Sequence, residues 1–200
     1  DMTDNKSHSL NLGDKATFDW GVLESRVYYE KTRHSMNFGD DKQFMYGDAP
    51  GMPMETDGKN IGAVINAATL LGARDILRTG LEYQAYRLDD GWPPSGTGMM
   101  MSPNTFENIN DGQRDRYGIF GEWEARWTGQ WTTVLGARTE LVRMNTGDVQ
   151  GYSNTNGMGM MMHNYLAEST AFNARDRQRT DENMDITALA RYSPDPSQTY

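Results

Sequence analysis

The chain has 200 residues, a formal net charge of −9 and no cysteine. The acidic balance and the lack of a Lys/Arg cluster argue against nucleic acid as a partner. Without cysteine the chain alone builds neither a disulfide framework nor a thiolate metal site. The mean hydropathy of −0.77 and the lack of an apolar run of about 18 residues argue against a membrane-spanning helix, but they are compatible with a β-barrel, in which only alternate residues contact lipid.

The first predicted strand is short and covers Ser7 to Leu12. His8, Leu10 and Leu12 share one side of it, which we expect to face lipid, and Gly13-Asp14-Lys15 breaks the pattern. The prediction is therefore a brief strand that runs toward the periplasm and ends before residue 13.

A longer strand begins at Val22, after Phe18 and Trp20, which are candidates for an aromatic belt at the membrane surface. Its odd positions include Val27 and Tyr29, whereas its even positions are mostly polar. Alternation with a period of two is typical of a strand with one apolar and one polar face. We expect the even side to face the lumen of a barrel, and it carries Glu24, Arg26, Tyr28, Glu30, Thr32, His34 and Met36.

Two long loops are predicted over residues 37–58 and 89–114, which contain many Gly, Pro and Asp residues and show no period. Two strands lie between them, joined by a tight turn at 72–75. The apolar side of the first carries Ile61, Ala63, Ile65, Ala67 and Thr69, and that of the second carries Leu77, Thr79, Leu81, Tyr83 and Ala85.

A β-hairpin is predicted between residues 117 and 141. Apolar odd positions alternate with charged even positions from Tyr117 to Trp127, Thr128-Gly129-Gln130 turns the chain, and a second strand begins at Trp131. Tryptophans beside a tight turn are typical of a membrane interface, because the indole ring is apolar but carries a polar N–H. We therefore expect a transmembrane hairpin whose turn lies in the periplasm.

The last part of the chain predicts a third long loop over residues 146–180, a strand from Met184 to Tyr192, a turn at 193–197 and a further strand that begins near Tyr200. Short and long connections thus alternate strictly, as periplasmic turns and extracellular loops do in outer-membrane barrels. A soluble all-β domain is the alternative, but three loops of more than about 15 residues are uncommon in that class. We predict an all-β fold, an antiparallel transmembrane β-barrel segment of about eight strands.

Methionine is abundant, with 14 residues, and it is concentrated in the predicted loops. Thioethers are soft, neutral ligands that favour Cu(I), so a Met-rich outer surface could collect copper. Loop packing or sacrificial oxidation is the alternative role. The loop methionines are Met45, Met52, Met54, Met99, Met100, Met101, Met158, Met160, Met161 and Met162, and His163 follows the last of them.

A central metal site is predicted at His34 and Met36, which lie on the lumen side at the outer end of one strand. Side chains two residues apart on a strand share a face within roughly 7 Å, so an imidazole nitrogen and a thioether sulfur can bind one ion. An H-x-M sequence alone is a weak motif, and the loop methionines strengthen it. The sequence contains no catalytic arrangement, because the inward carboxylates accompany arginines in what we expect to be an ion-pair lattice of Glu122, Glu124, Asp181, Glu182, Arg116, Arg126, Arg138 and Arg191.

Three segments resemble the TonB-dependent outer-membrane copper receptors of Gram-negative bacteria. The segment R-D-R-Y-G-I-F-G-E-W-E-A-R-W-T-G-Q-W-T-T-V-L-G-A-R (114–138) is similar to TonB-dependent receptors broadly. Two others resemble the copper branch, Y-Y-E-K-T-R-H-S-M-N-F (28–38) and F-N-A-R-D-R-Q-R-T-D-E-N-M-D-I-T-A-L-A-R-Y-S-P-D (172–195).

The resemblance implies a monomeric 22-stranded barrel in the outer membrane, in contact with its lipid, occluded by a plug and driven by the TonB complex through a TonB box. It also implies a copper site shared between an H-x-M on the barrel and a C-x-x-x-M on the plug, and His34 and Met36 match the H-x-M. The plug, the TonB box and the cysteine ligand do not occur in residues 1–200, so we expect the chain to be a partial barrel domain of a larger protein.

The resulting hypothesis is a segment of a receptor that imports Cu(I), Cu(II) or both. His34 and Met36 form part of the central site, and loop residues capture copper first: Met99, Met100, Met101, Met158, Met160, Met161, Met162 and His163. One alternative is a receptor for a siderophore or another metal chelate, whose loops should carry Arg and aromatic residues instead. Another is a soluble, Met-rich copper-binding β-domain.

Overall fold

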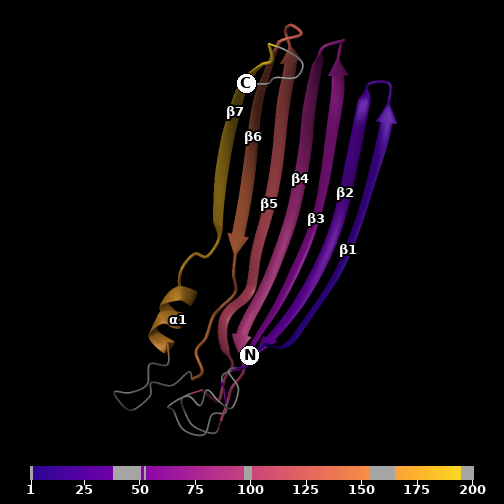
Figure 1. Ribbon diagram of the computed structural model, residues 1–200. Helices are drawn as coiled ribbons and strands as arrows, with labels where there is room; N and C mark the ends of the chain where they lie inside the picture. Colours follow the sequence, from indigo (N-terminus) through magenta and orange to yellow (C-terminus); the bar gives the residue numbers. More distant parts are fainter. Residues whose placement is uncertain (1, 38–50, 52, 97–100, 154–164, 195–200) are drawn as a thin grey trace.

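Seven strands form one antiparallel sheet in chain order, β1 to β7, in the computed structural model (Figure 1). The structure describes residues 2–37, 51, 53–96, 101–153 and 165–194. The all-β antiparallel prediction is confirmed, and the further strand expected near Tyr200 lies outside the described residues. The elements are β1 (Met2–Phe18), β2 (Gly21–Met36), β3 (Met54–Leu71), β4 (Asp75–Trp92), β5 (Phe106–Arg126), β6 (Trp131–Asn145), α1 (Leu166–Asn173) and β7 (Arg179–Tyr192).

Connections of two kinds lie at opposite ends of the sheet, as the sequence predicts. Figure 1 shows the tight turns at one end, and the long connections with α1 at the other, which we call the rim. The β5–β6 turn is closed by the amide of Trp127, which donates to the carbonyl of Trp131 at 3.0 Å, and by the Thr128 hydroxyl, which accepts from the amide of Gln130 at 3.1 Å. Among the described residues, no helix has the length and hydrophobicity to cross a bilayer.

One face of the sheet, the apolar face, is exposed along its whole width. The predicted outward residues do share it: Leu81 pairs with Ile119 across β4 and β5, and Trp123 pairs with Leu135 across β5 and β6. Leu81 is 54% exposed and Leu135 is 50% exposed. The described residues form a single sheet, with no second layer over this face, so the aliphatic side chains contact the medium as those of a membrane barrel contact lipid.

The opposite face, the polar face, carries the charged residues of β2 and β4–β6. It also packs aromatic rings over glycines of a neighbouring strand. The ring of Tyr28 lies where a Cβ on Gly62 would be, and the ring of Phe120 lies where a Cβ on Gly80 would be. The two glycines are therefore needed for close packing of β2 on β3 and of β4 on β5.

The first strand is much longer than the six residues predicted. Gly13-Asp14-Lys15 does not end it, because Gly13 stays opposite Arg26 and Lys15 stays opposite Glu24, with an ion pair of 2.6 Å between Lys15 and Glu24. Continuous pairing with β2 outweighs the turn propensity of this tripeptide, as tertiary context often does.

The three predicted loops are shorter in the structure, because strands extend into them. The loop expected over 37–58 ends where β3 begins at Met54, and the one over 89–114 lies between Trp92 and Phe106. The third, 146–180, contains α1 and ends as β7 begins at Arg179. Beyond the lipid zone a strand needs only backbone pairing and no apolar alternation, so the sequence pattern underestimates its length.

Candidate metal-binding site

His34 and Met36 lie on the polar face at the rim end of β2. His34 is directly opposite Asn5 on β1 and Thr56 on β3. Both His34 and Met36 are partly buried. Their shared face follows from their spacing of two residues, and it is the face that carries Glu24 and Arg26 farther down β2.

Met36 is the centre of a row of three methionines. It pairs directly with Met2 on β1 and with Met54 on β3. Directly opposed residues on antiparallel strands place their Cβ atoms roughly 4.5–5.5 Å apart on the same face. The row therefore brings three thioethers together beside the imidazole of His34.

A register shift between Met2 and Asp4 makes this row possible. From Asn5 onward β1 pairs regularly with β2, and without the shift Thr3 rather than Met2 would lie opposite Met36. A bulge of this kind adds one residue to a strand and re-aims the side chains beyond it. It places Met2 on the polar face with Met36.

Met2 and Met54 are candidate ligands that the sequence pattern did not identify as part of the central site. Met54 lay in a predicted loop, although its even number gives it the parity of the polar face of β3, opposite to that of Ile61 and Ile65. If the predicted strand had been extended toward residue 54, the even number of Met54 would have placed it on the polar face. Met2 had no comparable signal, because its position depends on the register shift.

The chemistry of this cluster suits a soft cation. Three thioethers and an imidazole favour copper over hard cations, which prefer oxygen ligands. Among the described residues, no group of three His, Cys, Asp or Glu side chains is placed to hold a metal ion. Beside His34, the Thr56 hydroxyl donates a hydrogen bond of 2.6 Å to the carboxylate of Asp90.

Most residues predicted for loop capture lie outside the described residues: Met99, Met100, Met158, Met160, Met161, Met162 and His163. Met101 is described and is 7% exposed, in a small core with Tyr152 that packs against Trp92 and Phe106. Thioethers contact aromatic rings favourably. This burial supports a packing role for Met101.

The same core holds the rim segments together. The rings of Trp92 and Phe106 stack at 5.1 Å between centroids, and Phe106 lies 5.4 Å from the ring of Tyr152. The amide of Asn104 donates to the carbonyl of Tyr152 at 3.0 Å. Burial raises the pKa of the Tyr152 hydroxyl to about 12, so this residue stays neutral and packs as an aromatic side chain at physiological pH.

A hollow of about 590 Å³ lies at the rim, and its lining is predominantly acidic. Its strand residues lie mainly on the apolar side, because Arg33 pairs with Asp57 and Ser35 with Glu55, one position away from His34 and Met36, which face the other way. A cation would be attracted to such a surface and an anion repelled. Its charged lining residues are Asp4, Glu55, Asp57, Asp89, Asp90, Glu107 and Arg33.

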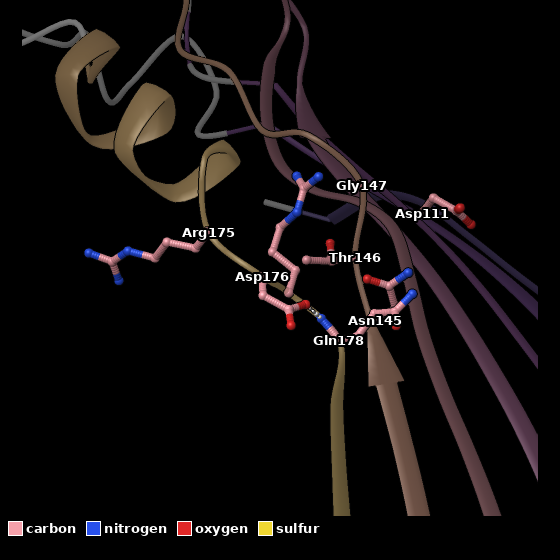
Figure 2. Close-up of a pocket in the computed structure, with 8 residues that line it drawn as sticks. Asp111, Asn145, Thr146, Gly147, Arg175, Asp176 and Gln178 are labelled. Atoms are coloured by element: carbon pink, nitrogen blue, oxygen red, sulfur yellow. Dashed lines mark hydrogen bonds between the residues drawn. The ribbon is translucent and has the colours of Figure 1, made fainter.

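A second hollow, of about 400 Å³, lies between the end of β6 and the segment that leads into β7 (Figure 2). Figure 2 shows Arg175 pointing away from the other labelled side chains, and the amide of Gln178 donates to Asp176 at 3.0 Å. Its described lining offers only oxygen and nitrogen groups, so it is a poor candidate for a soft metal. The lining residues are Asp111, Asn145, Thr146, Gly147, Arg175, Asp176, Arg177 and Gln178.

The predicted ion-pair lattice is present in part on the polar face, where Glu122, Glu124, Arg116, Arg126 and Arg138 form ion pairs. The inward prediction for Glu182 was wrong, because Glu182 lies opposite Leu141 on the apolar face. Arg138 contacts Glu82 at 2.6 Å and Glu140 at 3.2 Å, while Arg78 contacts Glu122 at 2.9 Å and Glu124 at 2.7 Å. Arg116 lies 3.6 Å from both Glu82 and Glu140, and Arg126 lies 3.0 Å from Glu124. These carboxylates are held by arginines, which supports a structural role for them.

Comparisons with known proteins agree with this architecture. Among solved structures, the chain matches one named "Copper transporter OprC" with a TM-score of 0.70 at 18% sequence identity, over 96% of this chain and 28% of that one. The chain thus spans less than a third of that structure, and at this identity the likeness shows the fold. A search of curated proteins finds no match. A family model described as "TonB dependent receptor-like, beta-barrel" matches residues 1–192, and the chain therefore belongs to the β-barrel family of the TonB-dependent receptors.

Proposed function

We propose that this chain is part of a TonB-dependent receptor that imports copper ions across the outer membrane of a Gram-negative bacterium. The observation that carries the proposal is the row of Met2, Met36 and Met54 beside His34 on the polar face. In a closed barrel that face lines the interior. The likeness of the fold to a structure named "Copper transporter OprC" supports the same substrate.

The chemistry of the row allows both oxidation states of copper. Thioethers favour Cu(I), while imidazole binds either state. The site would be shared with the plug, whose C-x-x-x-M ligands the family resemblance implies. Import would be powered by the TonB complex, and the barrel would act as a monomer within the lipid of the outer membrane.

The alternative within the family is a receptor for a siderophore or another anionic metal chelate, which needs cationic and aromatic groups around its ligand. The soft donors of Met2, Met36 and Met54 beside His34 support copper over such a chelate.

The loop methionines have a capture role in the proposal, except for Met101, whose burial favours packing. Deleting residues 158–162 should weaken copper uptake at low external copper, because fewer thioethers then collect the ion. The central site should keep its copper. Uptake by cells expressing the receptor, measured over a range of copper concentrations, distinguishes the two effects.

The site is tested by the copper content of the purified full-length receptor, measured by elemental analysis. The double variant His34→Ala, Met36→Ala should lose its stoichiometric copper. A matched control is Met184→Ala, because Met184 is 70% exposed on the apolar face of β7. Stoichiometric copper in the double variant would refute the assignment of the site to His34 and Met36. Loss of copper in the control would show that the effect is unspecific.

A soluble, Met-rich copper-binding β-domain is the alternative from another class. In a soluble domain, other parts of the protein should bury the aliphatic side chains. In this sheet, Val27, Ile65 and Ile119 are about half exposed on a continuous face. Cell fractionation tests the choice directly. Recovery of the full-length protein in the membrane fraction supports the receptor, and recovery in the soluble fraction would exclude it.

A further inference from the structure

The row of methionines on the polar face continues onto β4 as an aromatic residue. Glu55 on β3 lies opposite Gly91 on β4, so the next step of the same register brings Met54 beside Trp92, the last residue of β4. Trp92 in turn lies opposite Phe106 on β5. The rim end of the sheet therefore carries three thioethers followed by an indole and a phenyl ring.

Trp92 lies on the same face as the methionine row. Pairing of β4 with β3 is uninterrupted as far as Gly91, so parity holds along the strand. Trp92 shares the even parity of Arg78 and Glu82, which make ion pairs on the polar face. The odd residues on either side of it, Gly91 and Pro93, line the acidic hollow instead.

The ring of Trp92 lies between the small core at the rim and the thioethers. It stacks on Phe106 at 5.1 Å between centroids, and it packs against the core of Met101 and Tyr152. Phe106 belongs to β5, whereas Met54 belongs to β3. Because β4 lies between these two strands, the indole separates the core from the methionine row.

Packing alone does not explain a tryptophan at this position. The Nε1–H of Trp92 is buried and has no hydrogen-bond partner among the described residues, and an unpaired buried donor lowers stability. A phenylalanine would fill much of the same space without that cost. What a tryptophan adds is its π face, which attracts cations more strongly than the ring of tyrosine or phenylalanine.

We propose that Trp92 forms a wall of the copper site and contacts the bound ion through a cation–π interaction with its indole ring. The inference rests on the proposed function. Thioethers are neutral ligands, so a Cu(I) ion in the row keeps its positive charge toward the ring. Trp92 is partly buried, and a desolvated ring attracts a cation more strongly than an exposed one.

The same wall makes the site selective for Cu(I). Tetragonal Cu(II) takes further nitrogen or oxygen ligands, and an indole offers none on the side that it covers. Trp92 is therefore a specificity residue, in addition to the ligands His34, Met2, Met36 and Met54.

The test is a competition between the full-length receptor and a Cu(I) chelator under reducing conditions, which measures the affinity for Cu(I). Trp92→Leu should bind Cu(I) roughly tenfold more weakly. Trp92→Phe should lose less, because a phenyl ring keeps a weaker π face, and it serves if the leucine variant fails to fold.

The matched control is Phe106→Leu, which removes a ring from the same core but leaves the indole beside the methionine row. It should bind Cu(I) as the parent receptor does. A second readout is the change in indole absorption on addition of Ag(I), a soft ion that keeps its oxidation state. The parent and the control should show a change that both Trp92 variants lack, and a packing role alone would not produce it.

Three outcomes would overturn the proposal: unchanged Cu(I) affinity in both Trp92 variants, an equal loss in Phe106→Leu, or an Ag(I) signal that persists without Trp92. The double variant His34→Ala, Met36→Ala is measured on the same scale. If it loses its copper while the Trp92 variants match the parent, the cation–π contact is refuted and the copper site stands. If it keeps stoichiometric copper, the copper site itself is refuted, and the contact with it.

Discussion

The apolar and polar faces of the sheet share every strand but differ in what their side chains contact. Val64 and Ile65 on β3 show the difference between neighbours of similar shape. Ile65 lies opposite Leu81 on β4 and is 47% exposed, whereas Val64 lies opposite Glu82 and lines a hollow with Lys15. Two adjacent residues of one strand thus face opposite sides of the sheet, which in a barrel are the lipid side and the water-filled lumen.

Parity, more than hydrophobicity, determines the role of a residue in this chain. His34 and Met36 are candidate ligands because they share the side of Glu24 and Arg26. Lys31 and Lys59 lie on the apolar side, which they share with Val27 and Ile61. The same side chains one position away would have other partners.

The largest effect should come from a charge on the apolar face. Ile65→Arg should destabilise the full-length receptor in vesicles by about 2–4 kcal/mol, because a guanidinium near the bilayer midplane loses its hydration. Val64→Arg should change stability by less than about 1 kcal/mol, since the new cation lies in a hydrated lumen between Glu82, which attracts it, and Arg26, which repels it. Urea unfolding measures both. Equal costs at the two positions would contradict the assignment of the faces.

A smaller effect should come from crowding the polar face. Gly80→Val should cost about 1–3 kcal/mol, because its side chain would occupy the place of the Phe120 ring. The control is Gly121→Val on the apolar face, where an added Cβ meets no atom within 4 Å among the described residues. The same unfolding measurement should show the control within about 0.5 kcal/mol of the parent, and a cost as large as that of Gly80→Val would refute the packing argument.

The smallest effect should come from the ion-pair lattice. Arg138→Met leaves Glu82 and Glu140 without their closest partner, at a cost of about 1 kcal/mol, because the pairs are partly exposed and screened. Arg26→Met is the control, since Arg26 makes no ion pair among the described residues and stacks over Tyr28. Raising the salt concentration should shrink the Arg138 effect. A cost that does not change with salt would point to packing and not to charge.

Much of the fold follows from the sequence, because a half-exposed strand repeats every two residues. The hairpin with Trp127 and Trp131 at its turn, the two faces and the alternation of short and long connections are all confirmed. The predicted length of β1 was wrong, because pairing of Lys15 with Glu24 continues through residues that usually form turns. The sequence of one strand does not show how far its backbone pairing with the neighbouring strand continues.

The candidate site was only partly predictable. His34 and Met36 are two residues apart on one strand, so their common face can be read from the sequence. Met54 and Met2 join them through cross-strand register, which depends on the length of a long connection and on one bulge in β1. Neither leaves a periodic signal in the sequence, and a structure is needed to bring the three thioethers together.

The most direct test of the parity assignment is a nitroxide scan along β2 of the full-length receptor in lipid vesicles, with one label at a time from Val22 to Thr32. Collision rates with oxygen should peak at odd positions such as Val27 and Tyr29, and collision rates with a water-soluble nickel chelate should peak at even positions such as Tyr28 and Glu30. A scan without alternation, or with oxygen peaks on the even side that continues to His34 and Met36, would contradict both the membrane face and the metal site.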